Sequence, residues 1–168
     1  MWAVIKKALN STLGTKQFSA LDILAKKNTY NYFYNEWFGK NSTYGNKPKI
    51  YPITNEKKIN LDARGNGRPI VVLPPGVEEI EEPNQNLRLT SCFLPYGIKN
   101  INCKFLLDTE NLGHGFLCYI PETIEQISEN AFADLEYRDK IVINKKKDDL
   151  VGHPWGHPAG DKGIIYIG

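Results

Sequence analysis

Apolar side chains recur along the first thirteen residues at the spacing of a helix. The candidate stripe consists of four residues that lie three, four and four positions apart: Trp2, Ile5, Leu9 and Leu13. This spacing places them on one face of a helix, and Gly14 is suited to end it. Because a helix of about three turns is marginal alone in water, the stripe must pack against its own domain, another copy or a partner. We therefore take these four residues as candidate partner-binding residues.

The next part of the chain changes character twice. Ser19 can cap a second short helix over residues 20–27, and Asn28 can end it. Aromatic residues are then dense over residues 30–44, and Asn, Gly and Pro mark loops further on. We divide the chain into a helical attachment segment (1–28), an aromatic-rich and loop-rich connector (29–67) and a repeat domain (68–168).

Beyond Arg68 a short apolar pattern repeats. Three stretches share it: VVLPPGVEEI (71–80), CFLPYGIKNI (92–101) and CYIPETIEQI (118–127). Two further apolar runs, IVIN (141–144) and IIYI (164–167), continue the series at intervals in the low twenties. An earlier run, IYP (50–52), lies at a similar interval upstream, although the rest of its repeat does not match. Short strands at this period predict a solenoid with one β-strand per turn.

The composition of each repeat explains how such a turn forms. Proline ends each strand because it has no N–H to donate, and the glycine or threonine that follows lets the chain bend. Cys92 and Cys118 share one repeat position with Val71 and Ile141, so they are expected to be buried structural thiols. We therefore predict an α+β fold, in which the helical segment precedes a short solenoid.

Charge and composition exclude several classes of function. The net charge is +2, from 21 basic and 19 acidic residues, which argues against nucleic acid or an anionic membrane as the partner. No apolar stretch approaches the roughly 18 residues of a membrane span, and the N-terminus does not resemble a secretory signal. The three cysteines lack C-x-x-C spacing. We expect no cofactor and no membrane insertion.

Candidate catalytic groups are few. His153 and His157 are four residues apart, as in a helical metal site, but Pro154 and Pro158 disfavour a helix there. No spacing argues for His114 or Asp161 as further ligands. The run Glu78, Glu79, Glu81 and Glu82 is expected to face solvent, and Gly65 and Gly67 fit a plain turn. We expect no catalytic residues, no metal site and no enzymatic activity.

The stretch IPETIEQISENAFADLEYRDKIVIN (120–144) resembles the BspA-like class of leucine-rich repeat. Ile127, Ala131 and Phe132 match the I-x-x-x-A-F part of its pattern, which implies a helix or 3₁₀ segment between strands. Arrays of this class often close with a proline-tryptophan-glycine turn, which Pro154, Trp155 and Gly156 match. The resemblance implies that these three residues form a structural cap. Residues 81–89 and 102–116 lack the alanine-phenylalanine pair.

The first 24 residues resemble the opening of small structural proteins encoded by phages of Gram-positive bacteria. This resemblance implies a non-enzymatic virion protein of the tail, baseplate or decoration. Its helix would attach to other virion subunits or to its own copies, and its repeats would contact proteins or a host-surface protein or glycan. The alternative is a free-standing leucine-rich-repeat adhesion module, on the bacterial surface or secreted.

Overall fold

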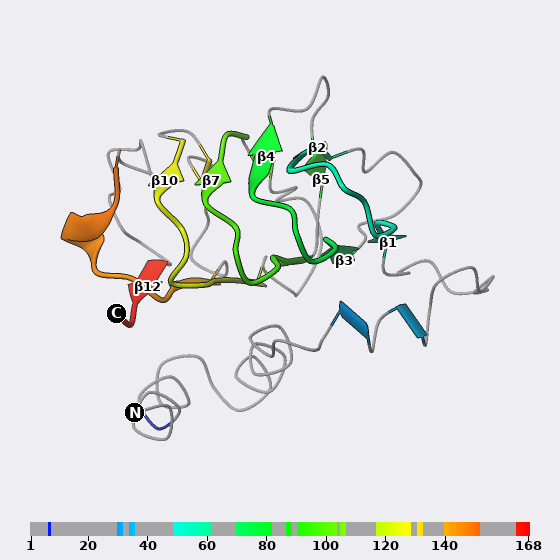
Figure 1. The fold of residues 1–168 in the computed structure, drawn as a ribbon. Coiled ribbons are helices and arrows are strands. Elements are labelled where there is room, and N and C mark those ends of the chain that lie inside the picture. Colours follow the sequence, from blue (N-terminus) through cyan, green and yellow to red (C-terminus); the bar gives the residue numbers. More distant parts are fainter. Residues whose placement is uncertain are drawn as a thin grey trace.

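A computed structural model shows a stack of short parallel strands (Figure 1). The structure describes residues 7, 30–31, 34–35, 49–61, 70–81, 87–88, 91–103, 105–106, 117–128, 131–132, 140–151 and 164–168.

The larger of the two main sheets has six parallel strands, which lie in chain order. They are β1 (Lys49–Ile50), β3 (Ile70–Val72), β6 (Ser91–Phe93), β9 (Leu117–Ile120), β11 (Lys140–Ile143) and β12 (Ile164–Tyr166). Their register aligns the first residues of the five predicted runs across the sheet: Val71, Cys92, Cys118, Ile141 and Ile164. The predicted repeat and its register are therefore confirmed.

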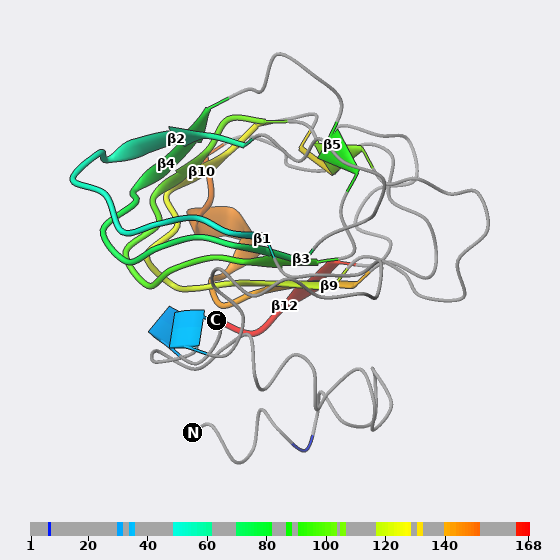
Figure 2. The same cartoon turned by 90° about the vertical axis from the view of Figure 1, so that its right-hand side faces the viewer.

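A second parallel sheet lies opposite the first (Figure 2). Its four strands are β2 (Lys58–Asn60), β4 (Glu79–Glu81), β7 (Asn100–Ile101) and β10 (Gln126–Ile127), and a two-stranded parallel sheet pairs β5 (Leu87–Arg88) with β8 (Phe105–Leu106). The prediction of one strand per turn is therefore wrong, because most turns supply a strand to each main sheet. Isoleucine recurs in register at Ile59, Ile80, Ile101 and Ile127 with polar neighbours, and this alternation forms a half-buried strand.

Helix contributes little to the described part of the repeats. A 3₁₀ turn, η1 (Lys147–Asp149), follows β11 and is exposed to solvent. Ala131 and Phe132, which were expected in a helix or 3₁₀ segment, lie in a turn with their side chains buried. In the regions that the structure describes, the arrangement is two all-parallel sheets of regularly spaced strands, which is consistent with a solenoid of the leucine-rich-repeat kind.

Strand β1 extends the array into the range 29–67. Lys49 pairs with Val71 and Ile50 with Val72, so the early IYP run joins the sheet one residue out of the predicted register. Tyr51, rather than Ile50, packs against the core. Strand β1 is the edge strand of the six-stranded sheet, and no described strand lies on its other side. Lys49 can therefore occupy a position that is apolar in the later turns.

Aliphatic side chains from the two main sheets fill the interior. They form rows along the stack, including Leu73, Leu94 and Ile120 at the ends of the strands of the six-stranded sheet, and Val77, Ile98 and Ile124 before the strands of the four-stranded sheet. Each proline-containing turn reverses the chain between the sheets. Gly76 and Gly97 have positive φ angles of 94° and 105° there, a conformation that glycine adopts readily.

The length of a turn is fixed on one side of the stack and variable on the other. Ile80 lies nine positions after Val71, and the same interval of nine recurs from Cys92 to Ile101 and from Cys118 to Ile127. The return to the six-stranded sheet takes 12 residues from Ile80 to Cys92, 17 from Ile101 to Cys118 and 14 from Ile127 to Ile141.

Candidate interaction surfaces

The six-stranded sheet is apolar on both of its faces. Its inner face packs against the core, and its outer face carries the residue next to each core position. We call the following row the outer apolar face: Ile50, Val72, Phe93, Tyr119, Val142 and Ile165. Its central members are buried, with exposed fractions of 0% for Val72 and Val142 and 8% for Tyr119. Burial of both faces is usual for parallel sheets.

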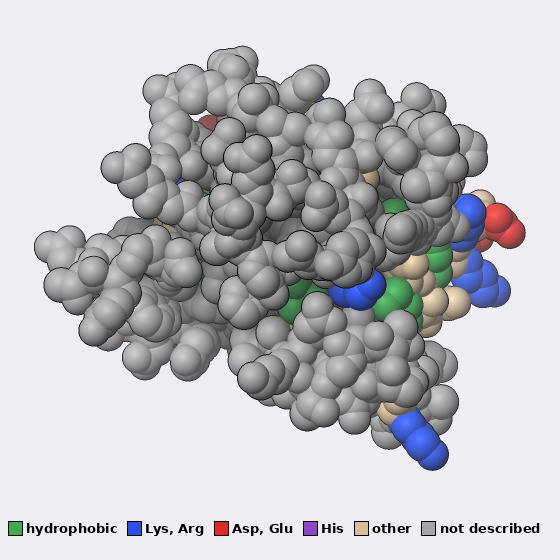
Figure 3. All heavy atoms as spheres, turned by 180° about the vertical axis from the view of Figure 1, so that it is seen from behind, with side chains coloured by type: hydrophobic (Ala, Val, Ile, Leu, Met, Phe, Trp, Pro, Cys, Tyr) green, Lys and Arg blue, Asp and Glu red, His purple; other side chains and the backbone are tan. Residues whose placement is uncertain are grey.

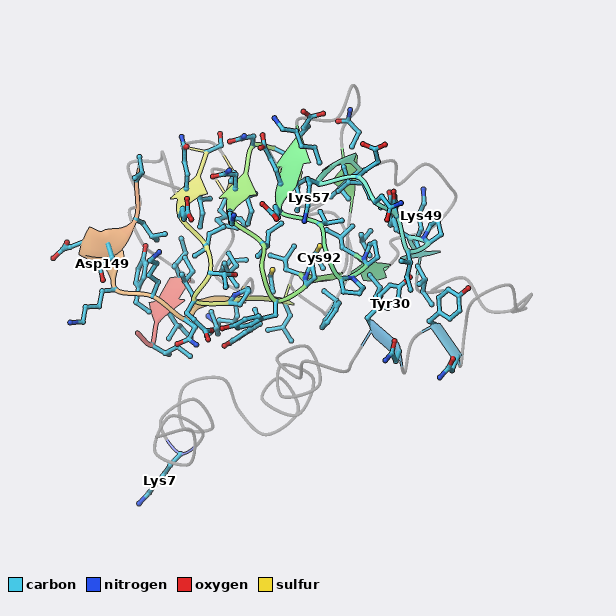
Figure 4. All side chains as sticks on the ribbon, viewed as in Figure 1. Lys7, Tyr30, Lys49, Lys57, Cys92 and Asp149 are labelled. Atoms are coloured by element: carbon cyan, nitrogen blue, oxygen red, sulfur yellow. The ribbon has the colours of Figure 1, made fainter. Side chains whose placement is uncertain are left out.

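A tyrosine pair far earlier in the chain lies against this face. Tyr30 and Tyr34 belong to the same apolar cluster, and their ring centroids are 5.8 Å apart. The Tyr30 hydroxyl donates a hydrogen bond of 2.6 Å to the carbonyl oxygen of Tyr51. Burial, with a smaller contribution from Tyr34, raises the pKa of Tyr30. Figure 4 shows Tyr30 outside the six-stranded sheet and Cys92 inside it, so the chain before β1 reaches the outer apolar face.

The outer side of the four-stranded sheet carries alternating charges. The charge ladder consists of one residue from each of four turns: Lys57, Glu78, Lys99 and Glu125. The carboxylate of Glu78 lies 2.9 Å from the Lys57 ammonium and 3.0 Å from the Lys99 ammonium. Hydrogen bonds from these two lysines lower the pKa of Glu78, and Glu78 raises the pKa of Lys99.

The polypeptide backbone holds the charge ladder in register. The amide of Glu78 donates to the Lys57 carbonyl, that of Lys99 to Glu78, and that of Glu125 to Lys99. A second row beside it pairs Lys58 with Glu79 at 3.3 Å, and Asn102 donates a hydrogen bond to Glu79. Opposite charges thus neutralise one another along this side. A separate group of described acidic and basic side chains lies at the right-hand edge of Figure 3, which is the end of the stack that carries η1 in Figure 1.

The turns between the two main sheets expose a few large side chains. Ile53 is 65% exposed and Tyr96 is 49% exposed, and both occupy the position after the proline of their turns. The hydroxyl of Tyr96 forms a hydrogen bond with Glu122, at the same position of a later turn, which raises the pKa of Tyr96. This edge of the array therefore offers apolar and polar contacts to another molecule.

The three cysteines are buried, and no disulfide joins them. Burial raises the pKa of Cys92 well above its ordinary value, and it raises the pKa of Cys118 as well. A thiol with a raised pKa is a poor nucleophile at neutral pH, because the thiolate is the reactive form. The prediction that Cys92 and Cys118 are buried is therefore confirmed.

Most residues that the sequence analysis selected lie outside the described part of the chain. These are the stripe (Trp2, Ile5, Leu9, Leu13), the cap (Pro154, Trp155, Gly156), and His114, His153, His157 and Asp161. Lys7, which a helical projection places opposite the stripe, is described, and it has helical backbone and an exposed side chain.

Neither a metal-binding cluster nor a membrane-spanning helix occurs in the described residues. They contain no group of three or more His, Cys, Asp or Glu residues placed to hold a metal ion. Nor does any helix in that part of the chain have the length and apolar character needed to cross a membrane.

Sequence reasoning missed the outer apolar face and the charge ladder, although both left a signal. The runs VVL, CFL, CYI and IVI are apolar without interruption, which is typical of parallel strands covered on both faces. Lys57, Glu78 and Lys99 recur at intervals of 21 residues, which is also the interval from Val71 to Cys92.

The geometry defines the class of this molecule as a parallel-strand repeat protein, consistent with a solenoid. Comparisons with protein-family models, with curated proteins and with solved structures find no match.

Proposed function

We propose that the protein is a non-enzymatic structural protein of a phage virion, in the tail, the baseplate or a decoration. The repeat array is a rigid body that presents its sides and turns to other proteins or to a host-surface protein or glycan. Residues 1–28 attach the array to other virion subunits or to further copies. The observation that carries the proposal is the position of Tyr30, which fixes the chain that follows the attachment segment against the sheet.

Several features of the array support a role in contact rather than in chemistry. Both faces of the six-stranded sheet are packed, which makes a stiff support. Burial raises the pKa of Cys92 and Cys118, which favours the unreactive protonated thiol, and the charge ladder pairs the carboxylate of Glu78 with two lysines. The exposed side chains of Ile53 and Tyr96 are suited to contact a partner.

The exposed turns equally favour a second function, that of a free-standing adhesion module. Such a module would bind a host or matrix protein through the array and would need no attachment segment. The two functions differ in what the predicted apolar stripe does in solution.

Light scattering of the full-length protein tests the proposal. We expect a defined oligomer, or co-assembly with a neighbouring virion subunit, that is lost in Leu9→Asp because a charge enters the apolar stripe. Lys7→Asp is the matched control, since Lys7 lies on the opposite side of the predicted helix, and it should assemble normally. A wild type that is monomeric and binds no virion subunit would overturn the proposal and favour the adhesion module.

A further inference from the structure

We infer that the outer apolar face is the docking site for residues 2–13 of this protein. This inference rests on the proposed function and specifies the surface to which the attachment segment binds. The argument begins with the burial of Val142. This side chain has an exposed fraction of 0%, although it points away from the core and belongs to the outer cluster. A second molecular layer therefore covers the sheet at β11.

The described residues account for only part of this layer. Apart from the sheet itself, the described members of the outer cluster are Tyr30, Tyr34 and Ile167. The Tyr30 hydroxyl is hydrogen-bonded to the carbonyl of Tyr51, the residue after β1. Strand β11 lies four strands further along the sheet, about 19 Å from β1 at the usual strand spacing. Neither tyrosine can reach Val142 from there. Ile167, whose amide donates a hydrogen bond to the Ile143 carbonyl, lies beside β11 and supplies one part of the cover there. No other described residue from outside the sheet belongs to the cluster at this end, so we assign the rest of the cover to another segment.

The chain before Tyr30 is the segment that is already continuous with this face. Sixteen residues separate Leu13 from Tyr30. At about 3.3 Å per extended residue they can reach any part of the sheet. The stripe also supplies large apolar side chains, of which Trp2 is the bulkiest, to a face made of aromatic and β-branched residues.

The spacing of the stripe residues along a helix matches the spacing of the strands under the outer apolar face. A helix over residues 2–13 is about 18 Å long and advances about 5.4 Å per turn, while neighbouring strands lie about 4.8 Å apart. A helix laid across the strands therefore brings roughly one stripe residue to each strand. The four stripe residues cover about four of the six strands, and Lys7 remains on the solvent side, where it is exposed.

This docking also suggests how copies attach. Residues 2–13 of one copy can bind the outer apolar face of a neighbouring copy in the same way as they bind their own, because both copies present the same face. Exchange of residues 2–13 between copies would then build the assembly without any new surface, as in domain swapping.

Photo-crosslinking of the full-length protein tests the inference. Leu9 is replaced by the apolar photo-crosslinker p-benzoylphenylalanine, and the irradiated protein is digested and analysed by mass spectrometry. We expect crosslinks to peptides that contain β6, β9 or β11. The same substitution at Lys7, the control, should give at least tenfold fewer of these products.

The mass of the crosslinked product separates the two proposals. Crosslinks from Leu9 to the outer apolar face, within one chain or between two chains, support the docking site. If such crosslinks form but the protein is monomeric and binds no virion subunit, the docking site stands and the proposed attachment function fails. Crosslinks from Leu9 that avoid these strands, or equal products from Lys7, would overturn the docking site. An oligomer that is sensitive to Leu9→Asp would then leave the proposed attachment standing.

Discussion

The thiol of Cys92 occupies a position in the interior that valine fills one turn earlier and a second cysteine fills one turn later. Its exposed fraction is 0%. Such a position requires an apolar group of small or medium size, because the neighbouring turns are stacked directly on either side. The thiol acts as a small hydrophobic group.

Two substitutions at Cys92 test this role. Cys92→Val should cost less than about 1.5 kcal/mol, because it keeps an apolar side chain of similar volume. Cys92→Ser should cost about 1–3 kcal/mol, because it places a hydroxyl among apolar neighbours. Urea unfolding measures both. In the folded wild type a thiol reagent should react with none of the three cysteines, and rapid labelling without denaturant would contradict the assignment.

The carboxylate of Glu78 is the centre of the charge ladder, and it makes stability depend on pH. Its pKa is lowered from an ordinary value of 4.5 by hydrogen bonds from Lys57 and Lys99. The unfolded chain therefore takes up a proton at higher pH than the folded chain does. The stabilisation is present above pH 4.5 and is lost as the pH falls through that value toward the lower folded pKa.

Urea unfolding at pH 6 and pH 3 measures this contribution. Glu78→Gln should lose less stability than the wild type over this interval, and added salt should narrow the difference because Glu78 is at the surface. Glu56→Gln is the control, since Glu56 is exposed and lies outside the charge ladder; it should behave like the wild type. Equal losses for the wild type and Glu78→Gln would refute the prediction.

At the scale of the element, the proline-containing turn controls the passage between the two sheets. Gly97 adopts a φ angle of 105°, and Thr123 takes the same place one turn later. The Thr123 hydroxyl accepts a hydrogen bond from the Gly97 amide and donates one to the Ile98 carbonyl. Consecutive turns are therefore tied together at the corner by a side chain.

Gly97→Ala should destabilise the protein by about 1–2 kcal/mol, because an L-residue is strained at this φ angle. A Cβ at this position would have no neighbour within 4 Å, so steric contact adds nothing to the cost. Gly97→Asn is the matched control and should cost less, since asparagine tolerates left-handed backbone better than alanine. Thermal or urea unfolding gives both values, and equal stability of Gly97→Ala and the wild type would contradict the assignment.

The strands of the six-stranded sheet could be predicted from the sequence because their apolar runs are continuous and followed by proline. The strands of the four-stranded sheet were missed because each carries a single apolar residue, such as Ile80 or Ile101, beside polar neighbours. The cover over the outer apolar face could not be predicted, since it depends on contacts between residues far apart in sequence, such as Tyr30 with Tyr51.

At the scale of the whole molecule, the six-stranded sheet is the middle layer of the fold. The core lies on one side of it and the cluster around Tyr30 on the other. Its outer residues therefore contribute to stability in the same way as its inner residues, which an exposed recognition surface would not do.

A pair of identical substitutions tests this layering. Val142→Ala should cost about 2 kcal/mol, because it leaves a cavity in a fully buried position. Val151→Ala should cost less than about 0.5 kcal/mol, since Val151 is 63% exposed. Denaturant unfolding gives both values. A neutral Val142→Ala would show that the outer apolar face is not packed.

The unequal halves of each turn have a consequence for how the molecule can change during evolution. The nine-residue path from Val71 to Ile80 recurs unchanged in two later turns, so an insertion or deletion there would move isoleucine out of register with its neighbours. The return path already varies between 12 and 17 residues while the strands stay aligned. Gains and losses of sequence should therefore accumulate on the return side, where the protein can acquire new contacts without refolding its sheets.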